Sequence, residues 1–352
     1  MKTLILHSII SSNTVYKLNS YIEKNKKELG QTFVIFCGKT EKNRRWVLNE
    51  KINFNYEILP NYSIRLGSKD LFTYFVTPTI LKKLNEINPQ NIIISGWDQF
   101  AYQLGYFWAL LRKRKITIWS GSTSFEKSWR RTMSLPLVRF FVKISDNYIA
   151  YGKFAKDYLV KLGADPNKIK IFINDVNKKY FENEAKKYKF IRKDIKQDLK
   201  INKTYNFIFV GQLIARKGLD NLIDSFIQFS RANSKWGLII VGYGKKEKYI
   251  NKYINKNKVD NIFFNGATEQ YDLPIYYSIS DCLILPSYEE VWGLVVNEAL
   301  YSRLKVIVSN RCGCWKDLIN SRVKGLVFDI EKKGDLLNKM KDMSKQIEKE
   351  YE

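Results

Sequence analysis

Two acidic residues, Glu290 and Glu298, lie eight positions apart in SYEEVWGLVVNEAL, with Gly293 between them. The apolar runs DCLILP and KVIVSN flank this stretch, so we expect a strand, a loop that holds Glu290, and a helix with Glu298 in its first turn. Backbone amides at a helix start bind anions, and a glycine allows close approach. Carboxylates there would accept hydrogen bonds from the vicinal hydroxyls of a ribose or hexose, or equally would complement the helix dipole.

Two adjacent cations, Arg216 and Lys217, occur in FVGQLIARKGLDNLI. A strand is expected to end at Gly211 and a helix to begin near Leu219, so the cations lie on a loop at the carboxyl end of a strand. Such a pair holds a diphosphate and stabilises charge on a leaving group. For an isolated pair, a solvated basic loop is the favoured interpretation.

His7 is the single histidine of the 352 residues. Any Ser-His-Asp triad, histidine metal site or histidine proton relay would have to use it, which excludes most hydrolases and metalloenzymes. The sequence also contains no Asp-x-Asp motif between its expected strands. These observations favour a reaction that needs no metal.

Short β-branched and aromatic runs alternate with amphipathic stretches along the whole chain. The expected strands are TLILHS, TFVIFCG, NYEILP, NIIISG, ITIWS, NYIAYG, KIKIFIN, YNFIFVG, WGLIIVG, NIFFNG, DCLILP, KVIVSN and GLVFD. Continuous apolar strands joined by helices indicate parallel sheets that are buried on both faces. Ligands of such folds bind beyond the carboxyl ends of the strands, and in a protein with two such domains the expected site is the cleft between them.

A polar, highly charged segment at 177–203 separates two such halves. We therefore expect an N-terminal domain at 1–176, a charged connection with some helix at 177–203, and a C-terminal domain with a terminal helix at 204–352. The opening MKTLILHSII is expected to be a first strand rather than a signal peptide. No apolar run reaches the length of a membrane span.

The formal charge of +25 indicates an anionic partner, although scattered lysine explains much of it. Basic and aromatic residues concentrate at 112–115 and 128–144. We hypothesise that these segments rest on an anionic membrane surface, while a core helix with a solvated face is an equally good interpretation of 128–144. We expect no nucleic-acid partner, because no basic stripe with aromatic platforms and no reading motif is present.

Several ordered motifs resemble one family, the retaining nucleotide-sugar glycosyltransferases of family 4, which have the GT-B fold of two doubly wound Rossmann-like domains facing across a cleft. The resemblance rests on the Glu-x7-Glu spacing of Glu290 and Glu298, and on the blocks FVGQLIARKGLDNLI, WGLVVNEA, DLPIYYSISDCLILPS, SNRCGCWKDLI and KGLVFDI. In the first half IIISGWDQFAYQLGYFWALL, ITIWSGST and YIAYGKFAKDYLVKLGADPNKIKIFIN also resemble bacterial members of the family. The resemblance to this family covers most of the chain, and most of its motifs lie in the second half.

This resemblance implies roles for the residues of the opening stretch. Glu298 matches the acid that binds the donor ribose, and Glu290 matches the acid that contacts the donor sugar. Gly293, Leu294 and Val295 match the backbone that meets the sugar and diphosphate.

The basic loop is implied to hold the diphosphate. Lys217 matches the family's diphosphate-binding lysine, and Gly211 lies at the glycine turn. Gln212 stands where the family usually has arginine, so one phosphate contact is missing, and Arg216 is the expected substitute.

The donor base and the acceptor are expected at other strand ends. Ala267 and Thr268, after NIFFNG, are expected near the base. Many relatives have a histidine near the reacting sugar, where this chain has Ser120. His7, Trp97 and Ser120 are therefore the candidates on the acceptor side, and a structural role for His7 is at least as well supported.

The resemblance implies a retaining, metal-independent transfer of a sugar from a nucleotide-diphosphate sugar to a glycan or lipid-linked hydroxyl, with no cofactor besides the donor. It does not distinguish UDP, GDP and dTDP. The expected location is cytoplasmic, with a peripheral position at the inner face of the cell membrane, and the expected role is in surface polysaccharide synthesis. A catalytically silent glycosyltransferase-like subunit and a GT-B nucleotide-sugar epimerase are the alternatives, the former because of Gln212 and the missing histidine.

Overall fold

A computed structural model describes residues 1–39, 48–66, 72–126, 128–256, 259–319 and 324–351. Its contacts divide the chain into two compact units, Met1–Asp175 and Val176–Glu352. The charged segment 177–203 belongs to the second unit and forms two of its helices, α7 and α8.

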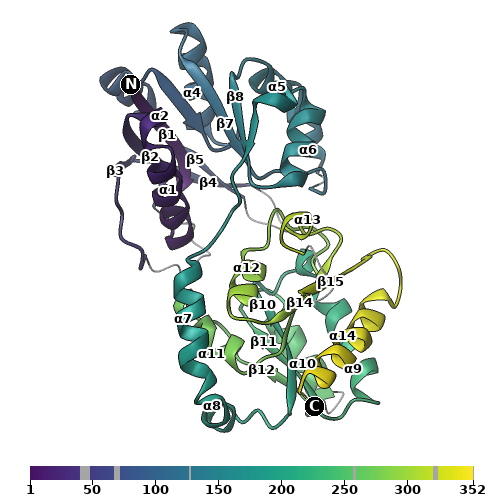
Figure 1. Ribbon diagram of the computed structural model, residues 1–352. Coiled ribbons are helices and arrows are strands. Elements are labelled where there is room, and N and C mark those ends of the chain that lie inside the picture. The colour runs from purple at the N-terminus through teal and green to yellow at the C-terminus, as the bar shows by residue number, and fades with distance from the viewer. Residues whose placement is uncertain (40–47, 67–71, 127, 257–258, 320–323, 352) are drawn as a thin grey trace. The chain divides into compact units, whose positions relative to one another are not determined.

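The first unit alternates strands and helices (Figure 1). Its elements are β1 (Lys2–Ile9), α1 (Ser12–Lys24), α2 (Lys26–Leu29), β2 (Gln31–Gly38), β3 (Asn55–Ile58), β4 (Tyr62–Leu66), β5 (Phe72–Val76), α3 (Ile80–Ile87), β6 (Asn91–Ile94), α4 (Phe100–Leu111), β7 (Lys115–Ser120), α5 (Trp129–Lys143), β8 (Asn147–Ala150), α6 (Lys153–Leu162), the 3-10 helix η1 (Pro166–Lys168) and β9 (Ile169–Ile171).

In the described part of this unit, the main sheet has the order β3-β2-β1-β6-β7-β8-β9 with parallel pairing throughout. Successive residues of a strand face opposite sides, and both faces are covered here. Leu4 and Leu6 pack in the core that α3 to α6 contribute, whereas Ile5 packs with Val15 and Leu18 of α1. Coverage of both faces explains why the strands read as continuous apolar runs.

An antiparallel hairpin of β4 and β5 is an element that the sequence patterns did not predict. Tyr62 pairs with Val76 and Leu66 with Phe72. The buried Gln99 holds β5 against the unit, because its side chain accepts a hydrogen bond from Phe75 N at 2.9 Å and donates one to Thr73 O at 3.1 Å.

The second unit repeats the alternating pattern (Figure 1). Its elements are α7 (Lys178–Lys189), α8 (Arg192–Asp198), β10 (Tyr205–Val210), η2 (Ala215–Lys217), α9 (Leu219–Ser230), β11 (Trp236–Val241), α10 (Glu247–Lys256), β12 (Ile262–Phe264), η3 (Gln270–Asp272), α11 (Leu273–Ser278), β13 (Cys282–Leu285), α12 (Leu294–Tyr301), β14 (Lys305–Ser309), α13 (Trp315–Leu318), β15 (Gly325–Phe328) and α14 (Asp335–Tyr351).

The second sheet has the order β12-β11-β10-β13-β14-β15 among the described residues, again with parallel pairing. Strand order reverses between β10 and β13, and the first sheet reverses in the same way between β1 and β6. Both units are therefore doubly wound and Rossmann-like, which confirms the predicted α/β class.

The terminal helix and two of the cysteines contribute to the buried parts of the protein. The apolar side of α14 packs into the core of the second unit, including Met340 and Met343. Cys37 and Cys282 are buried, unbridged thiols in β2 and β13. None of the described helices is long and apolar enough to cross a membrane.

Candidate functional site

The carboxyl edge of the second sheet brings together the loops that follow β10 and β13. These strands are neighbours at the point where strand order reverses, which is where ligands of doubly wound folds bind. Gly218 lies between the loops with a φ of +68°, and a Cβ at this position would lie 1.9 Å from the carbonyl oxygen of Pro286. Only glycine fits both the backbone conformation and the close approach.

Lys217 and Glu290 form an ion pair across these two loops, between Nζ and Oε2. Both side chains are largely shielded, at 13% and 12% exposed, and Ser287 Oγ lies 3.5 Å from the same carboxylate oxygen. The structure therefore brings the predicted diphosphate cation and the predicted sugar-contacting acid into direct contact. The positive charge of Lys217 and the negative charge of Glu290 therefore neutralise each other.

The backbone around Glu290 is held by the segment that follows β14. Glu290 N donates to Arg311 O at 3.2 Å, and Gly313 N donates to Glu290 O at 3.0 Å. Gly313 must lack a side chain, since a Cβ there would lie 1.9 Å from Val291 O. The carboxylate of Glu290 is thus presented from a loop fixed on two sides.

Gly293 ends this loop and begins α12 with a φ of +97°. Leu294 and Val295 form the half-buried first turn, and the N-cap residue Gly293 has no side chain to cap this helix start. The expectation that Glu298 lies in the first turn is wrong. Because α12 begins at Leu294, Glu298 is its fifth residue and lies in the second turn.

Glu298 is a buried carboxylate, with 2% of its surface exposed. Its Oε2 accepts a hydrogen bond from Tyr277 at 2.7 Å, and its Oε1 accepts one from Gln270 at 2.9 Å. Burial raises the pKa of Glu298 to about 7, and these two hydrogen bonds oppose the rise. The carboxylate is therefore poised to change protonation near neutral pH.

Tyr277 and Gln270 are site residues that the sequence reasoning missed. Tyr277 is buried in α11, and Gln270 opens η3 after β12. The block DLPIYYSISDCLILPS, which contains Tyr277, contributed to the family resemblance but carried no residue role. No local signal ties Gln270 to an acid 28 positions away.

The other predicted donor-side residues also lie at the carboxyl edge of the second sheet, after β10 or after β12. Arg216 is half-buried and donates to Glu289 O at 3.3 Å, so it too contacts the loop after β13. Gly211 and Gln212 directly follow β10 and are half-buried. Ala267 and Thr268 follow β12, which is two strands from β10 in the sheet.

The predicted acceptor-side residues occupy the carboxyl edge of the first sheet but divide between its faces. His7 lies near the end of β1 and packs against Phe36, with ring centroids 6.0 Å apart. Ser120, the last residue of β7, follows Trp119 and therefore points to the opposite face from that indole. Trp97 packs against the core under α3 to α6, on the face opposite to His7. The three do not form one cluster.

Lys17 of α1 lies close to His7 and was also missed. It is only 5% exposed, and its Nζ donates to Tyr151 Oη at 2.5 Å and lies 5.2 Å from the centre of the Trp119 ring. Burial lowers the pKa of His7 well below its usual value, and the charge of Lys17 lowers it further. The helical spacing of Lys17 beside the buried Thr14 and Leu18 was a signal that would have indicated its burial.

No metal was predicted, and among the described residues no group of three His, Cys, Asp or Glu side chains is arranged to hold one. Cys312 and Cys314 are buried without a disulfide.

Comparison with known proteins gives a family match that covers most of the second unit. Residues 191–351 match the family described as "Glycosyl transferases group 1". The crystal structure of HepE from Anabaena in complex with UDP resembles the whole chain, with a TM-score of 0.72 and 16% identity over 99% of this chain and 90% of that one. At this identity the likeness shows the fold, which is GT-B.

Two curated relatives are similar over parts of their sequences. An uncharacterized 41.2 kDa protein in the cps region of Klebsiella pneumoniae is 26% identical over 67% of this chain and 64% of its own length. The alpha-monoglucosyldiacylglycerol synthase of Acholeplasma laidlawii is 27% identical over 30% of this chain and 27% of its own. The alignments thus span less than two thirds of either relative.

Proposed function

We propose that this chain, whose residues 191–351 match the group 1 glycosyltransferase family and which has the GT-B fold, transfers a sugar from a nucleotide-diphosphate sugar to an acceptor hydroxyl with retention of configuration. The observation that carries the proposal is the cluster at the carboxyl edge of the second sheet. There Lys217, Glu290 and Glu298 combine a cation with two carboxylates beside an uncapped helix start.

Each member of this cluster has a proposed task that follows from its chemistry. Glu298 binds the ribose hydroxyls, which donate to a carboxylate and thereby favour its ionised form. Lys217, assisted by Arg216 and the amides of the first turn of α12, binds the diphosphate. Glu290 then exchanges its ion pair with Lys217 for the hydroxyls of the donor sugar. The ion pair seen without ligand keeps both groups in place until the donor arrives.

The proposed reaction breaks the bond between the anomeric carbon and the diphosphate oxygen and forms one to the acceptor oxygen on the same face. The acceptor proton passes to the departing phosphate oxygen. The protein contributes positioning and a fixed positive field for the leaving group, rather than proton transfer by a side chain. We retain metal independence as part of this proposal.

A lipid-linked or surface-glycan acceptor is the proposed partner. One relative is named a diacylglycerol-glycolipid synthase and another lies in a cps region, which supports this class of acceptor. We likewise retain the predicted cytoplasmic location, at the inner face of the cell membrane.

The outer surface of α4 and α5 supports a membrane contact. Trp129 and Met133 of α5 are 69% and 72% exposed, and Phe140 stacks on Phe107 of α4 with ring centroids 6.2 Å apart. The predicted basic segment 112–115 directly follows α4, and the segment 128–144 contains α5, so both lie beside neighbouring helices that expose apolar rings. Flotation with anionic and neutral vesicles tests this contact, and a chain that binds neither at moderate salt contradicts it.

A panel of UDP-, GDP- and dTDP-sugars tests the transfer. We expect one donor to yield free nucleoside diphosphate slowly alone and faster with a glycan or glycolipid acceptor, with the anomeric configuration of the product retained by NMR. Conversion of the sugar while it stays attached to the nucleotide would identify an epimerase instead. No binding of any donor would indicate a catalytically silent subunit.

A further inference from the structure

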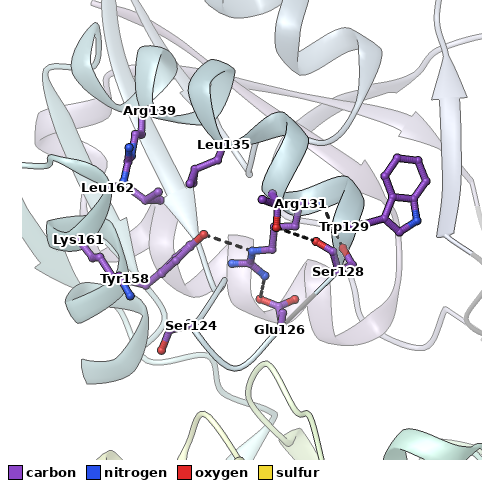
Figure 2. Close-up of a pocket in the computed structure, with 11 residues that line it drawn as sticks. Ser124, Glu126, Ser128, Trp129, Arg131, Leu135, Arg139, Tyr158, Lys161 and Leu162 are labelled. Atoms are coloured by element: carbon purple, nitrogen blue, oxygen red, sulfur yellow. Dashed lines mark hydrogen bonds and ion pairs between the residues drawn. The ribbon is translucent and has the colours of Figure 1, made fainter.

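A pocket of about 480 Å³ lies in the first unit, between Ser124, Glu126 and Ser128, α5 and the end of α6 (Figure 2). It is separate from the strand ends that hold His7 and Ser120, since none of the predicted site residues lines it. A pocket of this size accommodates a group such as a sugar phosphate or a lipid headgroup.

Arg131 forms a fixed wall of this pocket. Its guanidinium pairs with Glu126 at 2.7 Å, donates to Thr123 O at 2.9 Å and to Tyr158 Oη at 3.2 Å, and lies 4.6 Å from the centre of the Tyr158 ring. Figure 2 shows Tyr158, Arg131 and Glu126 joined by these contacts. Arg131 thus connects Thr123 and Glu126 to Tyr158 of α6, and its positive charge is neutralised by Glu126. The wall is ordered before any ligand arrives.

Two further cations line the pocket without a carboxylate partner. Arg139 of α5 and Lys161 of α6 are exposed, and in the described parts of the chain neither forms an ion pair. Glu126 is the one carboxylate among the described lining residues, and it is already paired with Arg131. The pocket therefore carries a net positive charge of about two, which an anionic ligand would neutralise.

The remaining lining residues indicate which kind of anionic ligand would fit the pocket. The hydroxyls of Ser124, Ser128 and Thr132 are hydrogen-bonding groups for oxygen-rich ligands, and the exposed indole of Trp129 stands at the rim on the side away from Arg139 and Lys161 (Figure 2). A guanidinium fork matches phosphate oxygens, and a lysine adds a point charge. An apolar rim would accept the carbon part of a phosphate ester.

We propose that this pocket binds the phosphate group of a phosphate ester, with Arg139 and Lys161 as the phosphate ligands and the Arg131–Glu126 pair as the positioning frame. The ester is either a membrane lipid headgroup or a free sugar or glycerol phosphate, because both present the same group. The site lies wholly in the first unit and does not depend on the proposed transfer reaction.

The test compares two double variants of the full-length chain. Arg139→Gln with Lys161→Gln removes both phosphate ligands. Arg231→Gln with Lys168→Gln removes the same charge from exposed positions that lie outside the pocket and outside the basic segments 112–115 and 128–144. All four positions are exposed, so both variants should keep the thermal unfolding midpoint of the parent.

Calorimetric titration with glycerol 3-phosphate and flotation with phosphatidylcholine vesicles, with and without phosphatidylglycerol, are the two readouts. We expect glycerol 3-phosphate binding or phosphatidylglycerol-dependent flotation to weaken about tenfold in the pocket variant and to change little in the control. Loss of glycerol 3-phosphate binding assigns a free ester, and loss of flotation alone assigns a lipid headgroup.

Two results would overturn the proposal: equal weakening in both variants, which would indicate diffuse charge, or no weakening of either readout in the pocket variant. Release of nucleoside diphosphate from a donor sugar is measured on the same samples and should not change in the pocket variant. Failure of that reaction in the parent chain would contradict the proposed function and leave the pocket result standing.

Discussion

The buried polar groups at the carboxyl edges of the two sheets differ in whether they have hydrogen-bond or ion-pair partners. At the second edge, Lys217 pairs with Glu290, and both oxygens of Glu298 accept hydrogen bonds. At the first edge, both ring nitrogens of His7 and the Nε1 of Trp119 are buried without a hydrogen-bond partner among the described residues. The folds of the two edges are alike, so the difference lies in the side chains that the strand ends carry.

This difference determines how well the polar groups of each edge are preorganised to bind a ligand. Paired charges at the second edge are held in place and can be exchanged for ligand groups at small cost, as preorganised electrostatic sites require. An unpartnered buried polar atom costs about 1–3 kcal/mol, and the first edge holds several around the buried cation Lys17. The Lys217–Glu290–Glu298 cluster at the second edge therefore has a partner for each charged group, whereas His7 and Trp119 at the first edge have buried polar atoms without a hydrogen bond among the described residues.

Removing the cation of the second edge should have the largest effect. We expect Lys217→Ala to lower turnover about 10²- to 10³-fold, since it deletes the side chain proposed to stabilise the leaving diphosphate. Lys248→Ala, at an exposed position of α10, is the matched control. Rates come from nucleoside diphosphate release, with circular dichroism to confirm the fold. Full activity of the Lys217 variant would refute its place in the site.

The protonation of Glu298 predicts a pH dependence of stability at the second edge. Its folded pKa of about 7 lies above its ordinary value near 4.5, so the folded state retains a proton that the unfolded state has lost. This contribution is complete below pH 4.5 and is lost as pH rises through about 7, at up to about 3 kcal/mol. The variant Glu298→Gln has no ionisable carboxyl at this position and therefore lacks this pH-dependent contribution.

Urea unfolding of both proteins from pH 5 to pH 8 measures this contribution. The parent should lose stability relative to Glu298→Gln as pH rises. A constant difference would show that Glu298 does not titrate in this range.

Removing the counter-charge should separate binding from turnover. In Glu290→Gln, Lys217 loses its anionic partner and attracts a diphosphate more strongly, so we expect nucleoside diphosphate to bind about five- to tenfold tighter. Sugar transfer should fall, because the proposed contact to the donor sugar weakens. Calorimetry and steady-state rates measure the two effects, and weaker diphosphate binding would contradict the proposed exchange of partners.

At the first edge the smallest change in stability is expected. His7→Leu removes a buried imidazole that has no hydrogen-bond partner and is held neutral by its lowered pKa. Thermal unfolding should change by about 1 kcal/mol or less, toward greater stability. If His7 serves the acceptor, transfer should fall more than donor hydrolysis. A loss of several kcal/mol would show that His7 has a structural partner.

Sequence patterns predicted the parallel strands because burial on both faces makes each one a continuous apolar run, as in NIIISG for β6. The β4–β5 hairpin was missed, because YSIRL mixes polar and apolar residues and has no such run. The Lys217–Glu290 and Glu298–Gln270 contacts join segments that are far apart in the chain. Spacing along the chain identified Lys217, Glu290 and Glu298 through the family motifs, but it carries no record of the side chains across the sheet that pair with them.

The acceptor-side roles of His7, Trp97 and Ser120 were predicted only from their positions at the ends of expected strands. Strand ends placed His7, Trp97 and Ser120 on one edge, yet the alternation of side chains sends Ser120 to the opposite face from Trp119. Lys17 was overlooked among many lysines, although its helical position beside Leu18 placed it on the buried face. In so basic a composition, Lys17, the one buried lysine among the described residues, does not stand out from the others.

The central claim is that the second edge holds a nucleoside diphosphate through Lys217 and Glu298. Calorimetric titration of UDP, GDP and dTDP into the parent chain, Lys217→Ala and Glu298→Ala tests it most directly. We predict that one nucleotide binds the parent and that each variant weakens its binding at least about tenfold. Equal affinity in all three proteins, or no binding of any nucleotide to the parent, would contradict the account.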